Sequence, residues 1–254
     1  MNTRGITLLA LALATVAAPC RAEQRPFRYA VSGGAAVSAL RVAATDRVSG
    51  GAAQLTSSPG PALWLRFEDQ RPGVFQPFFA VEAAYHSLPG SAGKPLDPNT
   101  ITLWNLALGT RVRLSESKRW HLGGRAELGT ELFVLGFTTT SQLRSSLLPR
   151  GEVSLECEAL RQGSWTWGLE ALAGAVFSTS DSAHTIRNGY RVGGALRANR
   201  RLQGGPGSQD AITASLFVVR DSYNGSLTAQ SVVRFGLRFG WRWEISPQGW
   251  EPAR

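Results

Sequence analysis

The sequence predicts an all-β protein: a closed, antiparallel, up-and-down transmembrane β-barrel of about ten strands, with eight or twelve strands also compatible. Three observations support this prediction. The last extended segment separates apolar from charged residues by parity, nine earlier segments precede it, and the connections between segments alternate in length. After the N-terminus no run approaches the ~20 apolar residues of a membrane helix, so any crossing of a membrane must be made by strands.

The last segment, residues 231–245, carries the clearest pattern. Its odd positions from Val233 to Ile245 are all apolar, whereas its even positions include Arg234, Arg238 and Arg242. Successive side chains of a strand point to opposite faces, so one face is apolar and the other charged. A transmembrane barrel needs both faces, since lipid lies outside and a polar lumen inside. A soluble β-sandwich or lipocalin-like barrel is the alternative, because its strands alternate too.

Turn residues divide the chain into ten extended segments without a linker that would mark a second domain. The connections 68–73, 115–118, 162–164 and 203–209 are short, and 43–59, 87–99, 136–148, 178–187 and 222–227 are longer. Outer-membrane barrels have short periplasmic turns and longer external loops, and an even strand count places both termini in the periplasm. The predicted strands are residues 27–42, 61–68, 74–86, 100–114, 119–135, 149–161, 165–177, 188–202, 210–221 and 229–245.

One choice of parity per strand places most apolar side chains outside, including Leu122, Leu128 and Leu132 of the segment 119–135. The same choice gathers charged side chains inside the barrel. The predicted lumen charge network consists of Arg111, Arg113, Arg125, Glu127, Glu131, Glu152, Glu156, Glu158, Glu170, Arg191, Arg197, Arg234, Arg238 and Arg242.

Tryptophans test this topology, because amphipathic rings prefer the two membrane interfaces. Most of them lie beside the short connections, and Trp104 lies beside a long one. The predicted interface aromatics are Trp104, Trp120, Trp165, Trp167, Trp241 and Trp243. The segments around residues 33–34 and 63–65 fit the pattern least well.

The N-terminus predicts export. Arg4, an apolar stretch over residues 6–18 and the small-x-small site at residues 20–22 are typical of a cleaved signal peptide at residues 1–22. Lipidation at Cys20 and an uncleaved anchor are the alternatives. Cleavage leaves Cys157 as the single cysteine, which excludes an internal disulfide. The predicted organisation is a signal peptide (1–22), a barrel (23–245) and a periplasmic tail (246–254).

The net charge of +9 falls to +7 without the signal, which holds Arg4 and Arg21 and no acid. Much of this charge lies on inward strand positions, so we expect it to face the lumen rather than nucleic acid. In a narrow barrel, arginines and glutamates can bridge the lumen, with Arg234, Arg238 and Arg242 pairing with Glu152, Glu156 and Glu158 or their neighbours. Such pairs make a plug; opposed charges without contact would make a narrow pore.

Enzymatic chemistry finds little support. Ser180, Asp181 and His184 lie in one predicted loop, but triad members usually converge from different segments. The glycines at 204, 205 and 207 lack the lysine and hydroxyl residue of a phosphate loop. We therefore expect no catalytic site, no cofactor and no metal.

With its signal peptide, strand periodicity and aromatic-rich last strand, the chain resembles small bacterial outer-membrane β-barrels, the broad class of the OmpA membrane domain and of OmpW-like and OmpX-like proteins. The resemblance covers the mature chain, carries no family motif, and implies outer-membrane lipid, lipopolysaccharide and the barrel-assembly machinery as partners. In this class the last strand commonly ends the protein on an aromatic residue. The chain departs from that pattern, because eleven residues follow Trp243.

The predicted role is a non-enzymatic structural or docking component, with periplasmic or outer-membrane subunits as partners in an envelope-spanning assembly for motility, secretion or export. A narrow pore for ions or solutes and a lipid-modifying enzyme or protease at the rim are the alternatives.

Overall fold

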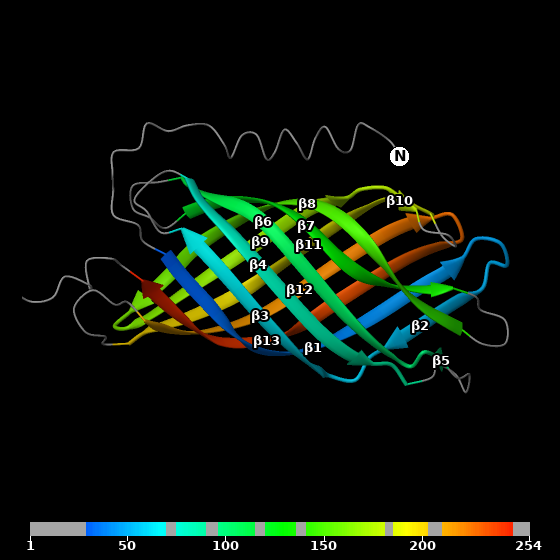
Figure 1. Cartoon of the computed structure of the whole chain (residues 1–254), viewed down its shortest axis with the longest axis horizontal. Coiled ribbons are helices and arrows are strands. Elements are labelled where there is room, and N and C mark those ends of the chain that lie inside the picture. Colours follow the sequence, from blue (N-terminus) through cyan, green and yellow to red (C-terminus); the bar gives the residue numbers. More distant parts are fainter. Residues whose placement is uncertain are drawn as a thin grey trace, which may run out of the picture.

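The computed structural model describes residues 29–69, 75–89, 96–114, 120–135, 141–180, 185–202 and 210–245. The predicted signal peptide and the predicted tail at residues 246–254 lie outside these residues. No helix within the described ranges is long and apolar enough to cross a membrane. The described chain is almost entirely β-strand (Figure 1).

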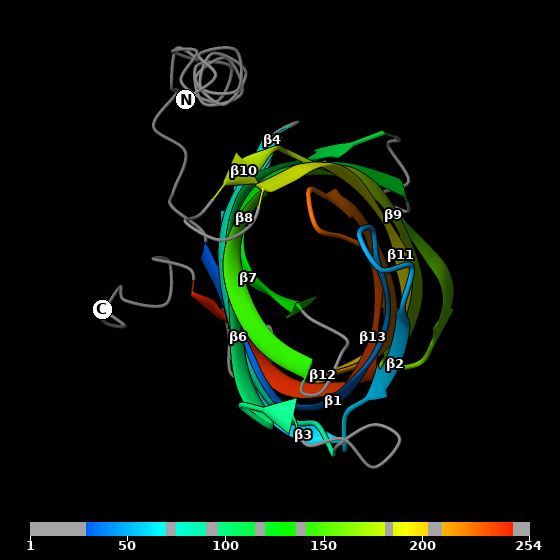
Figure 2. The same ribbon diagram turned by 90° about the vertical axis from the view of Figure 1, so that its right-hand side faces the viewer.

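Ten strands form the wall of a closed antiparallel barrel, as predicted, and three short strands are added to it. Each wall strand pairs with the next wall strand in the chain, and β1 pairs with β13 over their full lengths, which closes the ring (Figure 2). The wall strands are β1 (Tyr29–Asp46), β3 (Gly60–Asp69), β4 (Phe75–Ser87), β6 (Thr100–Arg113), β7 (Trp120–Leu135), β8 (Ser141–Gln162), β9 (Trp165–Val176), β11 (Thr185–Arg201), β12 (Ala211–Gly225) and β13 (Thr228–Ile245). The added strands are β2 (Ala52–Thr56), β5 (Leu96–Asp97) and β10 (Thr179–Ser180).

The two ends of the barrel differ. The short-turn end holds Tyr29, Ile245 and the connections β3–β4, β6–β7, β8–β9 and β11–β12. The tightest of these turns uses Gly163, whose φ of 58° favours glycine. The other end, here called the loop end, holds the remaining connections. Two predicted loops are shorter than expected there: β8 begins at residue 141 rather than 149, and only residues 226 and 227 separate β12 from β13.

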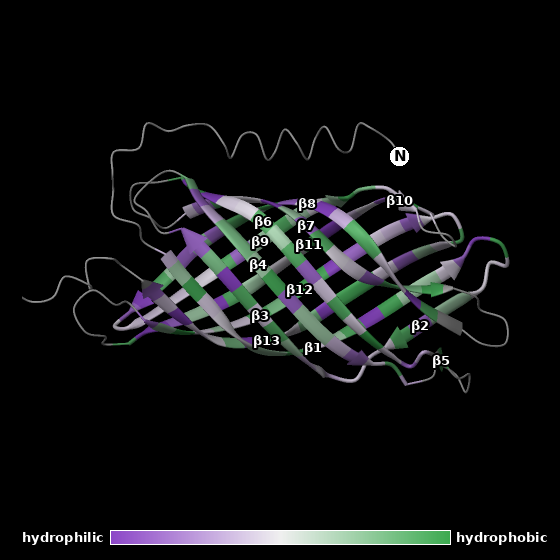
Figure 3. Cartoon of the chain, viewed as in Figure 1, coloured by the Kyte–Doolittle hydropathy of each residue, from purple (hydrophilic) through white to green (hydrophobic). Residues whose placement is uncertain are grey.

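Hydrophobic and hydrophilic residues alternate along the tilted strands (Figure 3). Large apolar side chains such as Val153, Leu216 and Leu237 lie exposed on the outside, at 58%, 54% and 45%. Together they form the apolar outer surface that a spanning barrel presents to lipid. Leu132 contradicts its predicted outward position, since it is fully buried at the loop end.

Trp64 explains the poor fit of the segment around residues 63–65. Its ring packs inside the barrel against Ala36, Ala62 and Ala84, three small buried residues of β1, β3 and β4. The strand alternates as expected, with Leu63 exposed outside, but the inward residue at position 64 is a large aromatic rather than a charged residue. Small inward residues on neighbouring strands leave the space that this ring occupies.

The interior has two layers. The charged residues occupy the middle of the lumen and its short-turn end, whereas a cluster of buried apolar residues occupies the loop end. This loop-end cluster contains Leu40, Val42, Ala44, Leu55, Leu88, Leu96, Ile101, Leu103, Leu132, Phe133, Val134, Leu143, Leu148, Val176, Ile186, Tyr223 and Val232.

Candidate functional site: the charged lumen

The central part of the lumen is crossed by a buried ion-pair cluster, here called the central cluster. Its members, contributed by β7, β8, β11, β12 and β13, are Glu127, Glu131, Arg150, Arg191, Asp221, Tyr223 and Arg234. None of these side chains is more than 8% exposed. A buried charge is tolerated only when it is paired and hydrogen-bonded, and the cluster meets that condition with four carboxylate or phenol groups around three guanidinium groups.

Arg150 is the hub of the central cluster. Its Nη1 donates to Glu127 and its Nη2 to Glu131, both at 2.8 Å, and its side chain is 1% exposed. Glu131 also accepts hydrogen bonds from the Tyr223 hydroxyl at 2.9 Å and from Arg234 at 3.0 Å. One carboxylate thereby joins β7 to β8, β12 and β13, on both sides of the lumen.

Arg191 completes the central cluster. Its Nε and Nη2 donate to the two carboxylate oxygens of Asp221, at 2.7 and 3.0 Å, while its Nη1 donates to Glu127 at 2.8 Å. The two bonds to Asp221 form the paired, planar geometry in which an arginine binds a carboxylate most specifically. Arg125 forms ion pairs with Glu127 and Glu152 beside this group.

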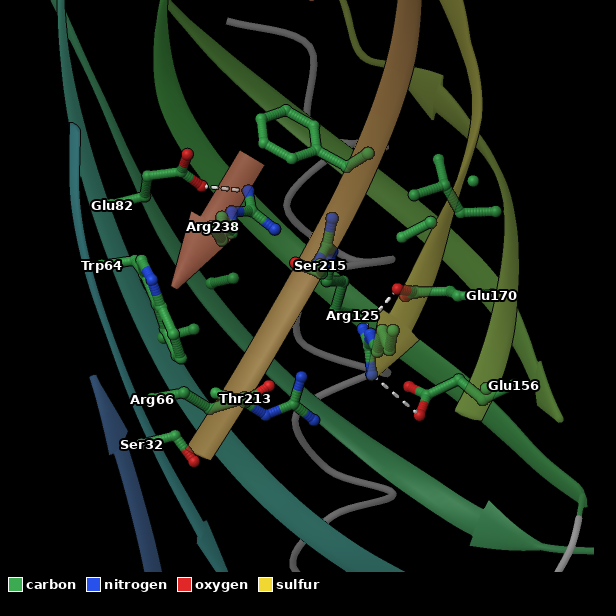
Figure 4. Close-up of a pocket in the computed structure, with 18 of the residues that line it drawn as sticks. Ser32, Trp64, Arg66, Glu82, Arg125, Glu156, Glu170, Thr213, Ser215 and Arg238 are labelled. Carbon is green, nitrogen blue, oxygen red and sulfur yellow. Dashed lines mark hydrogen bonds and ion pairs between the residues drawn. The ribbon is translucent and has the colours of Figure 1, made fainter. Parts of the chain in front are cut away.

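A second group lies nearer the short-turn end. Glu68 pairs with three guanidinium groups, those of Arg66, Arg111 and Arg242. Glu156 pairs with Arg111 and Arg197 at 3.1 and 3.2 Å, and Arg197 also pairs with Glu170. Between the two groups, Arg238 of β13 reaches Glu82 of β4 at 2.6 Å (Figure 4). Most of these pairs link non-adjacent strands, so they brace the lumen across its width.

A cavity of about 330 Å³ lies among these pairs. It is lined by side chains of both charge signs, by hydroxyl groups such as those of Ser32, Thr213 and Ser215, and by the ring of Trp64 (Figure 4). Arg66 lies over the ring of Phe78 and Arg238 over that of Phe217, with 4.0 and 4.2 Å from the guanidinium carbon to the ring centroid. The stacked rings hold these guanidinium groups in place.

Most residues of the predicted charge network take part in these contacts. Glu158 differs, since it pairs with the exposed Arg161 three residues on, and Arg113 forms no ion pair with another described residue. The predicted pairing of the last strand is wrong in detail: Arg234, Arg238 and Arg242 pair with Glu131, Glu82 and Glu68, not with glutamates of β8. Sequence reasoning missed Arg66, Glu68, Glu82, Arg150, Asp221 and Tyr223, although the inward parity of each of their strands could have found them.

The six predicted interface tryptophans lie on the outer parity of their strands. Five of them are at least 37% exposed, and Trp241 is partly buried. At the short-turn end the rings of Trp165 and Trp167 stack with centroids 6.0 Å apart, and those of Trp241 and Trp243 lie 6.3 Å apart. Trp104 lies towards the loop end, across from the others along the barrel axis.

The described histidines, His86 and His121, form no site with Cys157. His86 is fully buried, and neither of its ring nitrogens has a hydrogen-bond partner among the described residues. His121 lines the cavity, and Cys157 is a free thiol. Within the described ranges, no three His, Cys, Asp or Glu residues are grouped to hold a metal ion. Asp181 and His184, in the predicted loop 178–187, lie outside the described residues.

No protein-family model and no curated protein matches the chain. Among solved structures, the chain is similar to the outer membrane protease OmpT of Escherichia coli, with a TM-score of 0.48 and 9% identity over 89% of this chain and 99% of that one. It is similar to an outer membrane channel of Pseudomonas putida F1 (TM-score 0.42, 16% identity, 90% and 99% covered) and to OprG of Pseudomonas aeruginosa (0.35, 10%, 87% and 97%). All three are outer-membrane proteins, and it is the chain's own strand pairing that establishes the closed ten-strand wall.

Proposed function

We propose that the chain is a non-enzymatic integral β-barrel of the bacterial outer membrane that serves as a structural or docking component. The observation that carries this proposal is the closed lumen. The central cluster crosses the barrel with side chains at most 8% exposed, and the loop-end cluster of buried apolar residues lies beyond it. A lumen filled in this way is closed to solutes in this structure, which suits a structural component rather than an open pore.

The outer surface supports residence in a membrane. Exposed leucines, valines and phenylalanines cover the middle of the wall, and tryptophans lie towards both ends. Apolar strands flanked by aromatic residues suit a bilayer, and the alternation of short and long connections supports an orientation with the short-turn end in the periplasm. The same end holds both Tyr29 and Ile245, so the barrel begins and ends on the side where periplasmic subunits would bind.

The chemistry of the lumen supports a role without catalysis. The buried carboxylates of the central cluster, Glu127, Glu131 and Asp221, are each held in ion pairs by arginine. A general acid or base must reach its substrate, which these groups cannot do in this arrangement. We infer a docking role in an envelope-spanning assembly for motility, secretion or export.

A narrow pore is the second candidate, and the cavity of about 330 Å³ favours it. Planar bilayer recordings separate the two. The docking proposal expects the purified barrel to hold the bilayer at background conductance, and expects crosslinked envelopes to yield the tagged barrel together with the same periplasmic subunits in repeated captures. Steady conductance of porin size in the unmodified barrel would contradict the proposal and support the pore.

A further inference from the structure

The end of the β7–β8 hairpin leaves the barrel wall. The pairing of β6 with β7 stops at Asn105↔Gly129, although β6 continues to Thr100 and β7 to Leu135. The pairing of β8 with β9 starts only at Arg150↔Val176, nine residues after β8 begins. Residues 130–135 and 141–148 are here called the hairpin end: residues 130–135 pair with residues 142–147, and neither run pairs with β6 or β9. Ser141 and Gln142 pair instead with Leu96 and Asp97 of β5.

A glycine marks the point of departure. A Cβ atom at position 129 would overlap the side-chain oxygen of Asn105 on β6. At the next residue the Thr130 hydroxyl accepts a hydrogen bond from the Trp104 amide at 2.9 Å, in place of a backbone partner. The strand bends inward directly after this contact.

The hairpin end lies inside the lumen. Leu132 and Val134 share the strand parity of the lipid-facing Leu122 and Leu128, yet both are fully buried. Phe133, on the opposite face of the strand, is 1% exposed. Burial of both faces is possible only if the hairpin end has left the lipid surface, and the view into the loop end shows the ends of β7 and β8 within the ring (Figure 2).

Three residues of the far wall hold it there. The Val134 amide donates to the Gln230 side-chain oxygen at 3.0 Å, and the Gln230 side-chain nitrogen donates to the Leu132 carbonyl. Tyr223 donates to Glu131, and its ring lies 5.6 Å from that of Phe133. Arg234 also donates to Glu131. By contrast, the ion pairs of Arg150 with Glu127 and Glu131 join β7 to β8 and stay within the hairpin.

The empty place in the wall matches the hairpin end. Continuing the β6–β7 register beyond Asn105↔Gly129 would pair residues 104 to 100 with residues 130 to 134. In that register Leu132 would lie opposite Thr102 and point outward with it, while Glu131 would still face the lumen beside Leu103. Apolar Leu132 and Val134 suit a lipid-facing position as well as their present buried one, so the sequence satisfies both arrangements.

We propose that the hairpin end is a gate, and that the barrel conducts small hydrophilic ions when this segment moves from the lumen into the wall between β6 and β9. Closed and open states then differ by contacts that the structure identifies: the closed state has the bonds to Tyr223, Gln230 and Arg234 and the pairing of β8 with β5, and the open state has up to five strand pairs with β6. The lumen below the gate carries both charge signs around the cavity of about 330 Å³, which suits hydrated ions rather than apolar solutes. This inference rests on the closed lumen of the proposed function.

The first test weakens the contacts of Tyr223 and Gln230 with the hairpin end, here called the latch. The variant Tyr223→Phe with Gln230→Ala removes three hydrogen bonds to the hairpin end and leaves every ion pair in place. At about fivefold per net hydrogen bond, the ratio of closed to open barrels should fall on the order of a hundredfold. In potassium chloride, bilayers holding the variant should show discrete openings that the unmodified barrel lacks. Arg238→Gln is the matched control, because it breaks a lumen ion pair that does not touch the hairpin end.

The second test traps the open state. Thr102→Cys with Leu132→Cys, in a Cys157→Ser background, should form a disulfide only when the hairpin end lies in the wall, and reductant should return the oxidised barrel to background conductance. Openings in the control alone, or a latch variant that keeps heat-modifiable migration but stays at background, would overturn the gate. Openings without disulfide formation would overturn the wall-paired open state. An unmodified barrel that conducts steadily would instead contradict the proposed function.

Discussion

The Nη2 atom of Arg234 lies 3.0 Å from the Oε2 atom of Glu131, although the two residues are 103 positions apart. Their strands, β13 and β7, are five pairings apart in either direction around the ring, and Glu131 reaches the wall strand β13 from the hairpin end inside the lumen. The contact therefore spans the lumen and closes it at this height. It also shows that opposed charges in this barrel meet rather than face each other across water.

Arg150→Met should destabilise the barrel strongly. The substitution keeps much of the side-chain volume but leaves Glu127 and Glu131 buried with fewer cations, and the loss of one partner from a buried pair costs about 3–5 kcal/mol. The free energy of unfolding in urea, measured on barrels refolded in lipid vesicles, would report this loss.

Arg161→Met is the matched control for that experiment. Arg161 pairs with Glu158 at 3.2 Å, but its side chain is 54% exposed, and exposed pairs contribute roughly 0–1 kcal/mol. Equal stability of the two variants would mean that the central cluster is hydrated rather than buried.

Leu237→Arg tests the lipid face. Leu237 lies at the middle of β13, exposed on the outside, and arginine at the bilayer midplane costs about 2–4 kcal/mol in an outer-membrane barrel. Leu237→Ala is the control, because it removes apolar area without adding a charge. Assembly into vesicles should fall steeply for the arginine variant alone, and comparable assembly of both variants would show that this face does not meet lipid.

A substitution at Gly236, the inward neighbour of Leu237, would not test how much free space the lumen has. A Cβ atom there would overlap the carbonyl oxygen of Val37 on β1. Even alanine must shift the seam between β1 and β13, so a substitution at this position reports the backbone approach of the two strands rather than the room inside the barrel.

His86→Leu should leave the barrel as stable as before or make it more stable. The imidazole is fully buried, and no described residue offers either ring nitrogen a hydrogen bond, so its polar atoms are desolvated without compensation from them. Leucine is apolar and of similar size, and it would extend the loop-end cluster next to Leu88. Urea unfolding would measure the difference, and a loss of more than ~1 kcal/mol would show that an unseen partner satisfies the histidine.

The wall of the barrel could be predicted from the sequence because strand parity is a local property. Nine of the ten predicted segments agree with the observed strands to within a few residues, and inward parity alone placed Arg191 and Glu131 in the lumen. Which charges pair could not be predicted in the same way. Partners such as Arg238 and Glu82 lie on strands that are not neighbours, and their heights depend on the stagger of the whole barrel.

The alternation of apolar and polar residues also could not predict that the β7–β8 hairpin folds into the lumen. Leu132 and Val134 are apolar at lipid-facing parity, and burial in the lumen requires the same residue types as exposure to lipid. The start of β8 was missed for a different reason, since residues 141–148 contain polar residues that are typical of a loop. The contacts with Tyr223, Gln230 and Arg234 distinguish the two arrangements.

Gly34→Val should prevent the barrel from closing. Gly34 of β1 lies opposite Gly240 of β13 at the seam, and a Cβ atom at position 34 would overlap the carbonyl oxygen of Phe239. The atom in the way is backbone, so the clash can be relieved only by separating the two strands whose pairing completes the ring.

The unmodified barrel should fractionate with the outer membrane and migrate faster on gels before heating than after it, whereas Gly34→Val should show the slow, unfolded migration in both lanes. Ser32→Ala on the same strand is the control and should keep the fast form. Recovery of the unmodified protein in the soluble periplasm, or a Gly34→Val variant that keeps the fast form, would contradict a membrane barrel closed at the β1–β13 seam.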